Sequence, residues 1–187
     1  MLAQIAHPLR ALNAAAANSS LAAGALAVAV TGVVSLGLDL TAALVGGAGS
    51  AAIGLSIAIP VMLAVFWLVS AVLIGAGARL MGYRPERRRL LAVTGLTFPV
   101  LVMYAVIALL QAASAHWGGE LLATAAGLLA LPSVCWFVAL NAVAVRAVYD
   151  TAALSAVAIT LMPYAALSAV LLLLVIVLSV LHSAGAV

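Results

Sequence analysis

The chain has 187 residues, of which 68% are hydrophobic and 6% are charged, and its formal net charge is +3. An ordinary soluble domain is about half apolar and about one quarter charged, so this composition excludes a soluble globular protein. The length leaves room for about five membrane-spanning helices of roughly 20 to 25 residues each and for no separate soluble domain. We therefore expect an all-α integral membrane protein with one membrane domain.

Residues 1–20 are predicted to form a cytoplasmic or interfacial segment ahead of the membrane domain. Its apolar side chains recur at helical spacing, at Leu2, Ile5, Leu9 and Leu12. This spacing is typical of a short amphipathic helix that lies in the membrane interface. A cleaved signal peptide is the competing interpretation, but no compact apolar run follows Arg10 before the polar residues 18–20.

Five apolar segments follow, each long enough to cross a bilayer as a helix. They comprise residues 21–45, 56–80, 90–113, 121–145 and 152–181. The connections are short, so consecutive helices should be antiparallel neighbours. We predict that residues 21–187 form a bundle of five transmembrane helices.

All the basic side chains fall on one side of this predicted bundle. They are Arg10, Arg79, Arg84, Arg87, Arg88, Arg89 and Arg146. Because cytoplasmic loops carry an excess of basic residues, the N-terminus is predicted to be cytoplasmic and, with five spans, the C-terminus external.

The longest inner loop, residues 83–89, holds four arginines that we interpret as a contact surface for anionic lipids or a protein partner. These are Arg84, Arg87, Arg88 and Arg89. A purely topogenic role, in which the charges only direct insertion, is the alternative. The cluster is short and has Tyr83 as its sole aromatic neighbour, so no nucleic-acid partner is expected.

Small residues recur along the first span, at Ala23, Ala27, Thr31 and Ser35. Such a stripe allows close backbone approach of helices in lipid. We expect it to serve packing within the chain, and a dimer seam is the alternative, so the sequence leaves homo-oligomerisation open.

Three prolines lie about ten residues inside their spans, which places them near the bilayer midplane. They are Pro99, Pro132 and Pro163. We expect helix kinks at these positions, which would widen a cavity, although proline is also ordinary in membrane helices. The polar side chains available to line such a pathway are Asp39, Tyr104, Gln111 and Asn141. A small transporter or channel subunit is therefore the alternative function.

Two further sets of ionisable residues could interact. Arg146 and Asp150 are spaced i, i+4 at the end of the fourth span, so we predict a structural ion pair between them. A second set lies on the predicted external side and has side chains of the kinds that bind metal ions: Asp39, His116, Glu120 and His182. These four come from separate segments without ligand spacing, so no metal site is expected.

Catalytic motifs are missing from the sequence. It contains no H-E-x-x-H, no G-x-S-x-G and no Walker loop. We therefore expect neither enzymatic activity nor a bound cofactor.

The order of features between about residues 55 and 181 forms a recognisable series. The second span ends in residues 79–83, and Arg89-Leu90-Leu91 begins a third span that contains Phe98-Pro99. The fourth span contains Trp136 and Leu140 and ends in Ala144-Val145-Arg146. Residues 149–156 lead into a fifth span that contains Pro163. This order resembles the Yip domain family of five-span membrane proteins, whose eukaryotic members interact with Rab-type GTPases. The resemblance implies a non-enzymatic membrane adaptor or organiser that binds lipids or protein partners.

Two departures from that family affect what is expected. Where such proteins often show a tyrosine ahead of the third-span proline, this chain has Thr94-Gly95-Leu96-Thr97. Eukaryotic members also carry a long cytoplasmic N-terminal region, whereas about twenty residues precede the first span here, so Rab binding is not expected. The absence of lysine, with alanine and arginine in its place, is typical of a GC-rich bacterial genome, so we expect a protein of a bacterial inner membrane.

Overall fold

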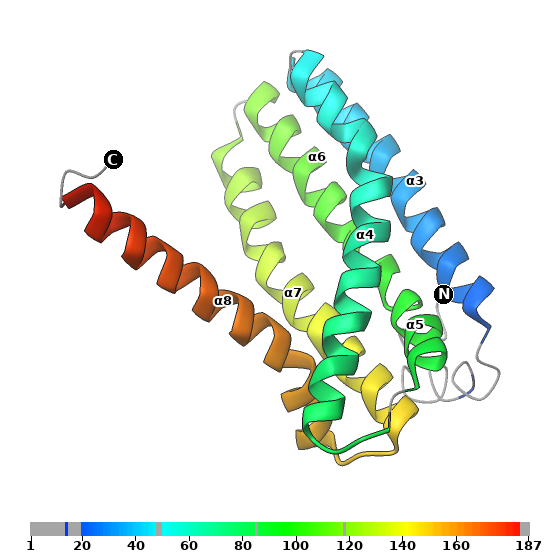
Figure 1. Cartoon of the computed structure of the whole chain (residues 1–187). Helices are drawn as coiled ribbons and strands as arrows, with labels where there is room; N and C mark the ends of the chain where they lie inside the picture. Colours follow the sequence, from blue (N-terminus) through cyan, green and yellow to red (C-terminus); the bar gives the residue numbers. More distant parts are fainter. Residues whose placement is uncertain (1–13, 15–19, 48–49, 85, 118, 184–187) are drawn as a thin grey trace.

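The computed structural model describes residues 14, 20–47, 50–84, 86–117 and 119–183, and these form helices without strands (Figure 1). The helices are α3 (Leu21–Val45), α4 (Ser50–Leu80), α5 (Arg87–Gly95), the 3-10 helix η1 (Phe98–Leu101), α6 (Val102–Trp117), α7 (Glu120–Tyr149) and α8 (Ala153–Ser183). The predicted all-helical class is confirmed. The predicted interfacial helix of residues 1–20 falls almost wholly outside the described residues.

Four helical segments are long and apolar enough to cross a membrane. They are Leu21–Val45, Ile53–Leu80, Arg87–Trp117 and Glu120–Tyr149. α8 is 31 residues long, but the apolar helix found within its described part covers Ala153–Ala166. The fifth span therefore stays a prediction. In Figure 1, α8 starts beside α4 and α7 and then diverges from α7 toward the C-terminus.

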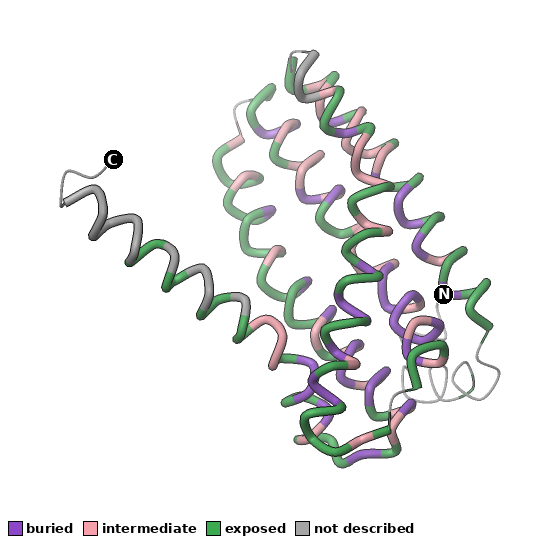
Figure 2. Tube along the Cα trace, in the orientation of Figure 1, coloured by how far each residue is buried: buried purple, intermediate pink, exposed green. Residues whose placement is uncertain are grey.

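Large apolar side chains cover the outside of the bundle. Leu26 is 64% exposed, Val72 68% and Leu128 71%. Exposed residues run along each long helix, while buried residues concentrate around α5 (Figure 2). Lipid chains can solvate such a surface and water cannot, so the arrangement suits a protein embedded in a membrane.

The third span is interrupted in its middle. α5 ends at Gly95, and η1 precedes α6. Pro99 has no backbone N–H and so cannot donate to the carbonyl oxygen of Gly95, which favours an interruption of the α-helix at this point. The Thr97 hydroxyl donates a 2.7 Å hydrogen bond to the carbonyl oxygen of Thr94. Both threonines are fully buried, and the same carbonyl oxygen also accepts a 3.0 Å hydrogen bond from the Thr97 N–H, so the buried Thr97 hydroxyl is satisfied within this turn.

The core of the bundle is built around this interruption. Val28, Trp67, Phe98 and Phe137 form one buried cluster, and the rings of Phe98 and Phe137 meet edge to face with centroids 5.6 Å apart. The Trp67 indole donates a 3.1 Å hydrogen bond to the carbonyl oxygen of Leu91 in α5. A second cluster joins α4, α5, α7 and α8 and comprises Ile74, Ala78, Leu90, Val93, Ala144, Val145, Val148, Ala156 and Ile159.

The backbones of α3 and α5 are in direct contact. A Cβ atom on Gly24 would lie 2.5 Å from the Ala92 carbonyl oxygen, and one on Gly95 would lie 2.6 Å from the Gly24 carbonyl oxygen. Only glycine fits at these two positions. Of the small residues predicted to line this face, Thr31 and Ser35 are buried, whereas Ala23 is exposed because the buried face of α3 begins one residue later, at Gly24.

Candidate functional site at the arginine-rich end

Six of the described arginines gather at one end of the bundle, where α4 ends, α5 begins and α7 ends. They are Arg79, Arg84, Arg87, Arg88, Arg89 and Arg146. We call this the arginine-rich end; it is the lower end of the bundle in Figure 1.

A tight turn at the end of α4 sets the position of the loop. Gly82 has φ +87°, and the N–H of Tyr83 donates to the carbonyl oxygen of Ala78 at 3.0 Å, which is the hydrogen bond of a glycine-terminated helix end. The turn directs Tyr83 back toward the bundle. Its hydroxyl lies 2.6 Å from that of Thr151 in the turn after α7. The loop is therefore attached to the α7–α8 turn.

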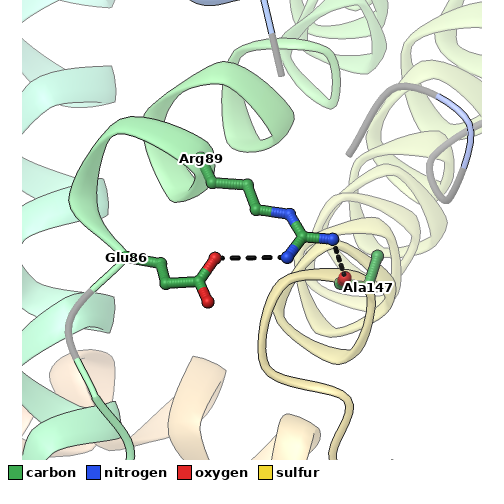
Figure 3. A network of polar contacts seen from close by, with 3 residues as sticks. All are labelled: Glu86, Arg89 and Ala147. Carbon is green, nitrogen blue, oxygen red and sulfur yellow. Dashed lines mark hydrogen bonds and ion pairs between the residues drawn. The ribbon is translucent and has the colours of Figure 1, made fainter. Parts of the chain in front are cut away.

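Arg89 also connects the loop to α7 (Figure 3). Its guanidinium donates to the Glu86 carboxylate at 3.2 Å and to the Ala147 carbonyl oxygen at 3.4 Å. A cation is favourable there because the last carbonyls of a helix lack intrahelical partners and carry partial negative charge. Arg89 thus has a structural role, while the side chains of Arg84, Arg87 and Arg88 are exposed. Contact of these arginines with lipid stays a prediction.

A groove between α4, α5 and α7 opens beside this loop, with a volume of about 230 Å³. Its lining consists of Ala71, Val72, Gly75, Ala76, Arg79, Arg87, Leu91 and Tyr149. Small residues of α4 leave the space, and two arginines from different helices border it. The groove therefore combines apolar walls with two cationic groups that also donate hydrogen bonds.

The Tyr149 hydroxyl lies buried at this groove and makes no hydrogen bond of acceptable geometry. Its polar neighbours are the backbone and the carboxylate of Glu86 and the guanidinium group of Arg79. A buried hydroxyl without a partner costs about 1 to 3 kcal/mol, so an acceptor that entered the groove would gain this bond. Two guanidinium groups and a hydroxyl donor are the groups that bind a phosphate or carboxylate.

Sequence reasoning missed Arg79 and Tyr149 as members of this site. The signal for Arg79 was present, because Ala71, Gly75 and Arg79 are spaced four residues apart and so form one face of α4. Tyr149 comes from another helix, and no local pattern in the sequence links it to that face.

The predicted ion pair of Arg146 with Asp150 stays a prediction. Within the described residues, the ion pair recorded within 4.0 Å is that of Arg89 with Glu86. Asp150 follows the last residue of α7 and has the left-handed backbone conformation, with φ 47° and ψ 48°. The i, i+4 spacing assumes a continuing right-handed helix, which Asp150 does not continue.

The three predicted kink positions differ in their surroundings. Pro99 lies in the interrupted third span, whereas Pro132 and Pro163 lie inside the continuous helices α7 and α8. Pro60, which was not predicted, lies inside α4, where its Cα would be 3.0 Å from a Cβ on Gly32. This proline therefore packs against α3.

The four predicted pathway residues only partly come together. Asp39 and Tyr104 line one central cavity of about 670 Å³. Gln111 is exposed, and Asn141 is buried with its amide donating to the Phe137 carbonyl oxygen at 2.9 Å; neither lines the cavity. Only two of the four residues predicted to line a polar pathway therefore share a cavity.

The external residues considered for a metal site are not gathered in the part of the chain that the structure describes. There, no three histidine, cysteine, aspartate or glutamate side chains lie together in a way that would hold a metal ion. The side chain of His182 lies outside the described set.

No protein-family model, curated protein or solved structure significantly matches the chain. Membership of the Yip family therefore stays a prediction.

Proposed function

We propose that the protein is a non-enzymatic membrane organiser that binds an anionic lipid in the groove between α4, α5 and α7. The observation that supports this best is the meeting of Arg79, Arg87 and the unpartnered Tyr149 hydroxyl at one groove. The proposal includes a bacterial inner membrane, five spans, and an arginine-rich end on the cytoplasmic side, where anionic headgroups attract basic residues.

The groove has the shape that a lipid requires. Its α4 wall extends from Ala71 to Arg79, or about 12 Å at 1.5 Å per residue. The upper part of an acyl chain fits along the small residues of this wall while the phosphate lies between the two arginines. Val72, on the same wall, is 68% exposed, so the groove opens toward the surrounding lipid and a ligand enters from the bilayer.

Each arginine near an anionic surface contributes about 1 kcal/mol of attraction. Arg79 and Arg87 together therefore supply roughly 2 kcal/mol, or about a thirtyfold preference for an anionic over a neutral lipid. Hydrogen bonds from the guanidinium groups and from Tyr149 to phosphate oxygens add to this preference at short range.

The test measures lipid retention by the full chain in nanodiscs that contain phosphatidylglycerol or phosphatidylcholine. Arg79→Gln/Arg87→Gln removes two charges at the groove, and Arg84→Gln/Arg88→Gln removes two exposed charges from the neighbouring loop as the matched control. At about 1 M salt, where the screening length falls to about 3 Å, only the groove variant should still retain less phosphatidylglycerol than the wild type. If the two double variants retained equal amounts of phosphatidylglycerol at high salt, the result would contradict lipid binding in the groove. The arginines would then have a purely topogenic role.

Tyr149→Phe tests the groove without changing any charge. It removes the unpartnered hydroxyl, so the protein in neutral lipid should unfold at the same or a higher temperature. Retention of phosphatidylglycerol should nevertheless fall, because the hydroxyl can no longer donate to a phosphate oxygen. Unchanged retention would exclude Tyr149 from the site.

The alternative function, a small transporter or channel subunit, is supported less well. It requires a continuous polar route, and of its four predicted residues only Asp39 and Tyr104 share a cavity.

A further inference from the structure

A cavity of about 670 Å³, open on one side, lies between the helices of the bundle, away from the arginine-rich groove. Residues of α3, α4, η1, α6, α7 and α8 line it, among them Asp39, Phe66, Tyr104, Phe137, Leu161 and Tyr164. Pockets for small molecules commonly measure about 300 to 1,000 Å³ and are mostly apolar with a few polar groups. This cavity has that size and that lining.

Aromatic rings form a fixed part of the cavity wall. The ring of Phe66 has its centroid 6.1 Å from that of Phe137 and 5.8 Å from that of Phe98. Phe98 is fully buried in the interrupted third span, so it holds the other two rings in place. Tyr104 and Tyr164 add two further rings to the lining.

Asp39 is the one acidic side chain among the residues that line this cavity. Its carboxylate forms neither an ion pair nor a hydrogen bond with any of the described residues. It follows Leu21 by 18 residues on α3, so the arginine-rich end is about 27 Å away along the helix. No arginine side chain spans that distance, and a charge at membrane depth is costly without a partner.

We infer that the cavity binds a lipophilic organic cation, whose charge pairs with Asp39 and whose apolar groups contact the rings of Phe66, Phe137 and Tyr104. Aromatic faces attract cations within about 6 Å, most strongly when water is excluded. An inorganic ion fits poorly because Ca²⁺ requires six to eight oxygen ligands, and the lining is mainly hydrocarbon.

The position of α8 provides a route from the bilayer. Its first turns supply Leu161 and Tyr164 to the cavity wall, and beyond them the helix diverges from α7 (Figure 1). In the diverging part, Leu172 and Leu173 are both exposed. An amphiphilic cation dissolved in the membrane therefore reaches the cavity sideways, without crossing a headgroup layer.

Equilibrium dialysis of tetraphenylphosphonium against the full chain in phosphatidylcholine nanodiscs tests this inference, with empty nanodiscs subtracted. The wild type should bind the cation saturably at one site per chain. Asp39→Asn should weaken binding at least about tenfold, and Glu120→Gln, which removes an acid that does not line the cavity, should leave it unchanged. Tetraphenylborate, of similar shape and opposite charge, should not bind at this site.

Three results would overturn the inference: no saturable binding by the wild type, equal binding by the wild type and Asp39→Asn, or equal binding of the two probe ions. Val138→Phe narrows the cavity beside Phe137 and keeps the acid, so it should weaken binding. Asp39→Glu keeps the charge, so it should bind the cation more tightly than Asp39→Asn does. Because neutral lipid is used, retention of phosphatidylglycerol by the arginine-lined groove is measured separately and either result stands without the other.

Discussion

The hydroxyl oxygens of Tyr83 and Thr151 lie 2.6 Å apart and join the turn after α4 to the turn after α7 across 68 residues of sequence. A hydrogen bond of this kind contributes about 1 kcal/mol to stability. We expect Tyr83→Phe to lower the free energy of unfolding by about that amount, measured by thermal unfolding in detergent.

Thr151→Val supplies the control, since it removes the second hydroxyl and keeps the shape of the side chain. The double variant should be no less stable than the worse single variant, because either change alone already breaks the bond. Additive losses would mean that the two hydroxyl groups act separately and that the two turns are not coupled by this contact.

The contact between α3 and α5 predicts a strong difference between two glycines of the same helix. Gly24→Ala would place a Cβ 2.5 Å from the Ala92 carbonyl oxygen, whereas Gly37→Ala meets nothing within 4 Å. We expect Gly24→Ala to destabilise the protein by about 3 kcal/mol through overpacking. Gly37→Ala should be neutral or stabilise it by up to about 1 kcal/mol through helix propensity.

The measurement is thermal unfolding of both variants in the same detergent, together with their yield from the membrane. Similar unfolding temperatures for the two variants would show that α3 and α5 do not approach as closely as Gly24 and Gly95 indicate.

The helices were predictable from sequence because long apolar runs in a membrane protein must form them. The predicted first span, residues 21–45, coincides with α3, and the predicted fourth, residues 121–145, falls short of the ends of α7 at Glu120–Tyr149. Helical hydrogen bonding continues into the less apolar flanks, which a hydropathy pattern cannot show. The third span was predicted as one helix, yet α5 ends at Gly95, whose carbonyl oxygen Pro99 cannot pair because it lacks a backbone N–H.

The candidate site was predictable only in part, for a related reason. Charge alone identified the arginine cluster, but it did not distinguish Arg89, which pairs with Glu86 and Ala147, from Arg87, which borders the groove. That distinction depends on how α5 lies against α7. Similarly, Asp39 and Tyr104 meet in the central cavity through the packing of α3 and α6, and no local sequence pattern records it.

The number of spans has a direct test. Reporters fused after Gly82 and after Thr151 should read cytoplasmic, while those after Gly47, after Gly119 and at the C-terminus should read external. Pairing a reporter that fluoresces only in the cytoplasm with an enzyme active only outside gives a positive signal at every position. A cytoplasmic C-terminus would leave four spans, with α8 not crossing the bilayer.

The end of α7 distinguishes a backbone role of Asp150 from the predicted ion pair with Arg146. Asp150 has φ 47°, a conformation that costs most L-residues roughly 1 to 2 kcal/mol and that glycine, asparagine and aspartate tolerate better. Its negative charge also lies at the negative end of the helix dipole, which is unfavourable. If backbone conformation decides the residue at this position, Asp150→Gly and Asp150→Asn should be neutral or slightly stabilising, and Asp150→Ala should lose about 1 kcal/mol.

An ion pair instead predicts a loss of stability in every variant that removes the charge of Asp150. Glycine, asparagine and alanine would all lose the attraction to Arg146, which is worth about 0.3 to 0.5 kcal/mol for an exposed pair on a helix. Arg146→Ala, introduced into the wild type and into each of the three Asp150 variants, separates the two effects. If the pair exists, Arg146→Ala should lower the stability of the wild type and leave the three variants unchanged. If the pair does not exist, Arg146→Ala should have the same effect in all four backgrounds. Thermal unfolding in detergent at low salt gives the readout, since screening at high salt would hide a pair of this strength. Given the left-handed conformation of Asp150, we expect Arg146→Ala to act equally in every background.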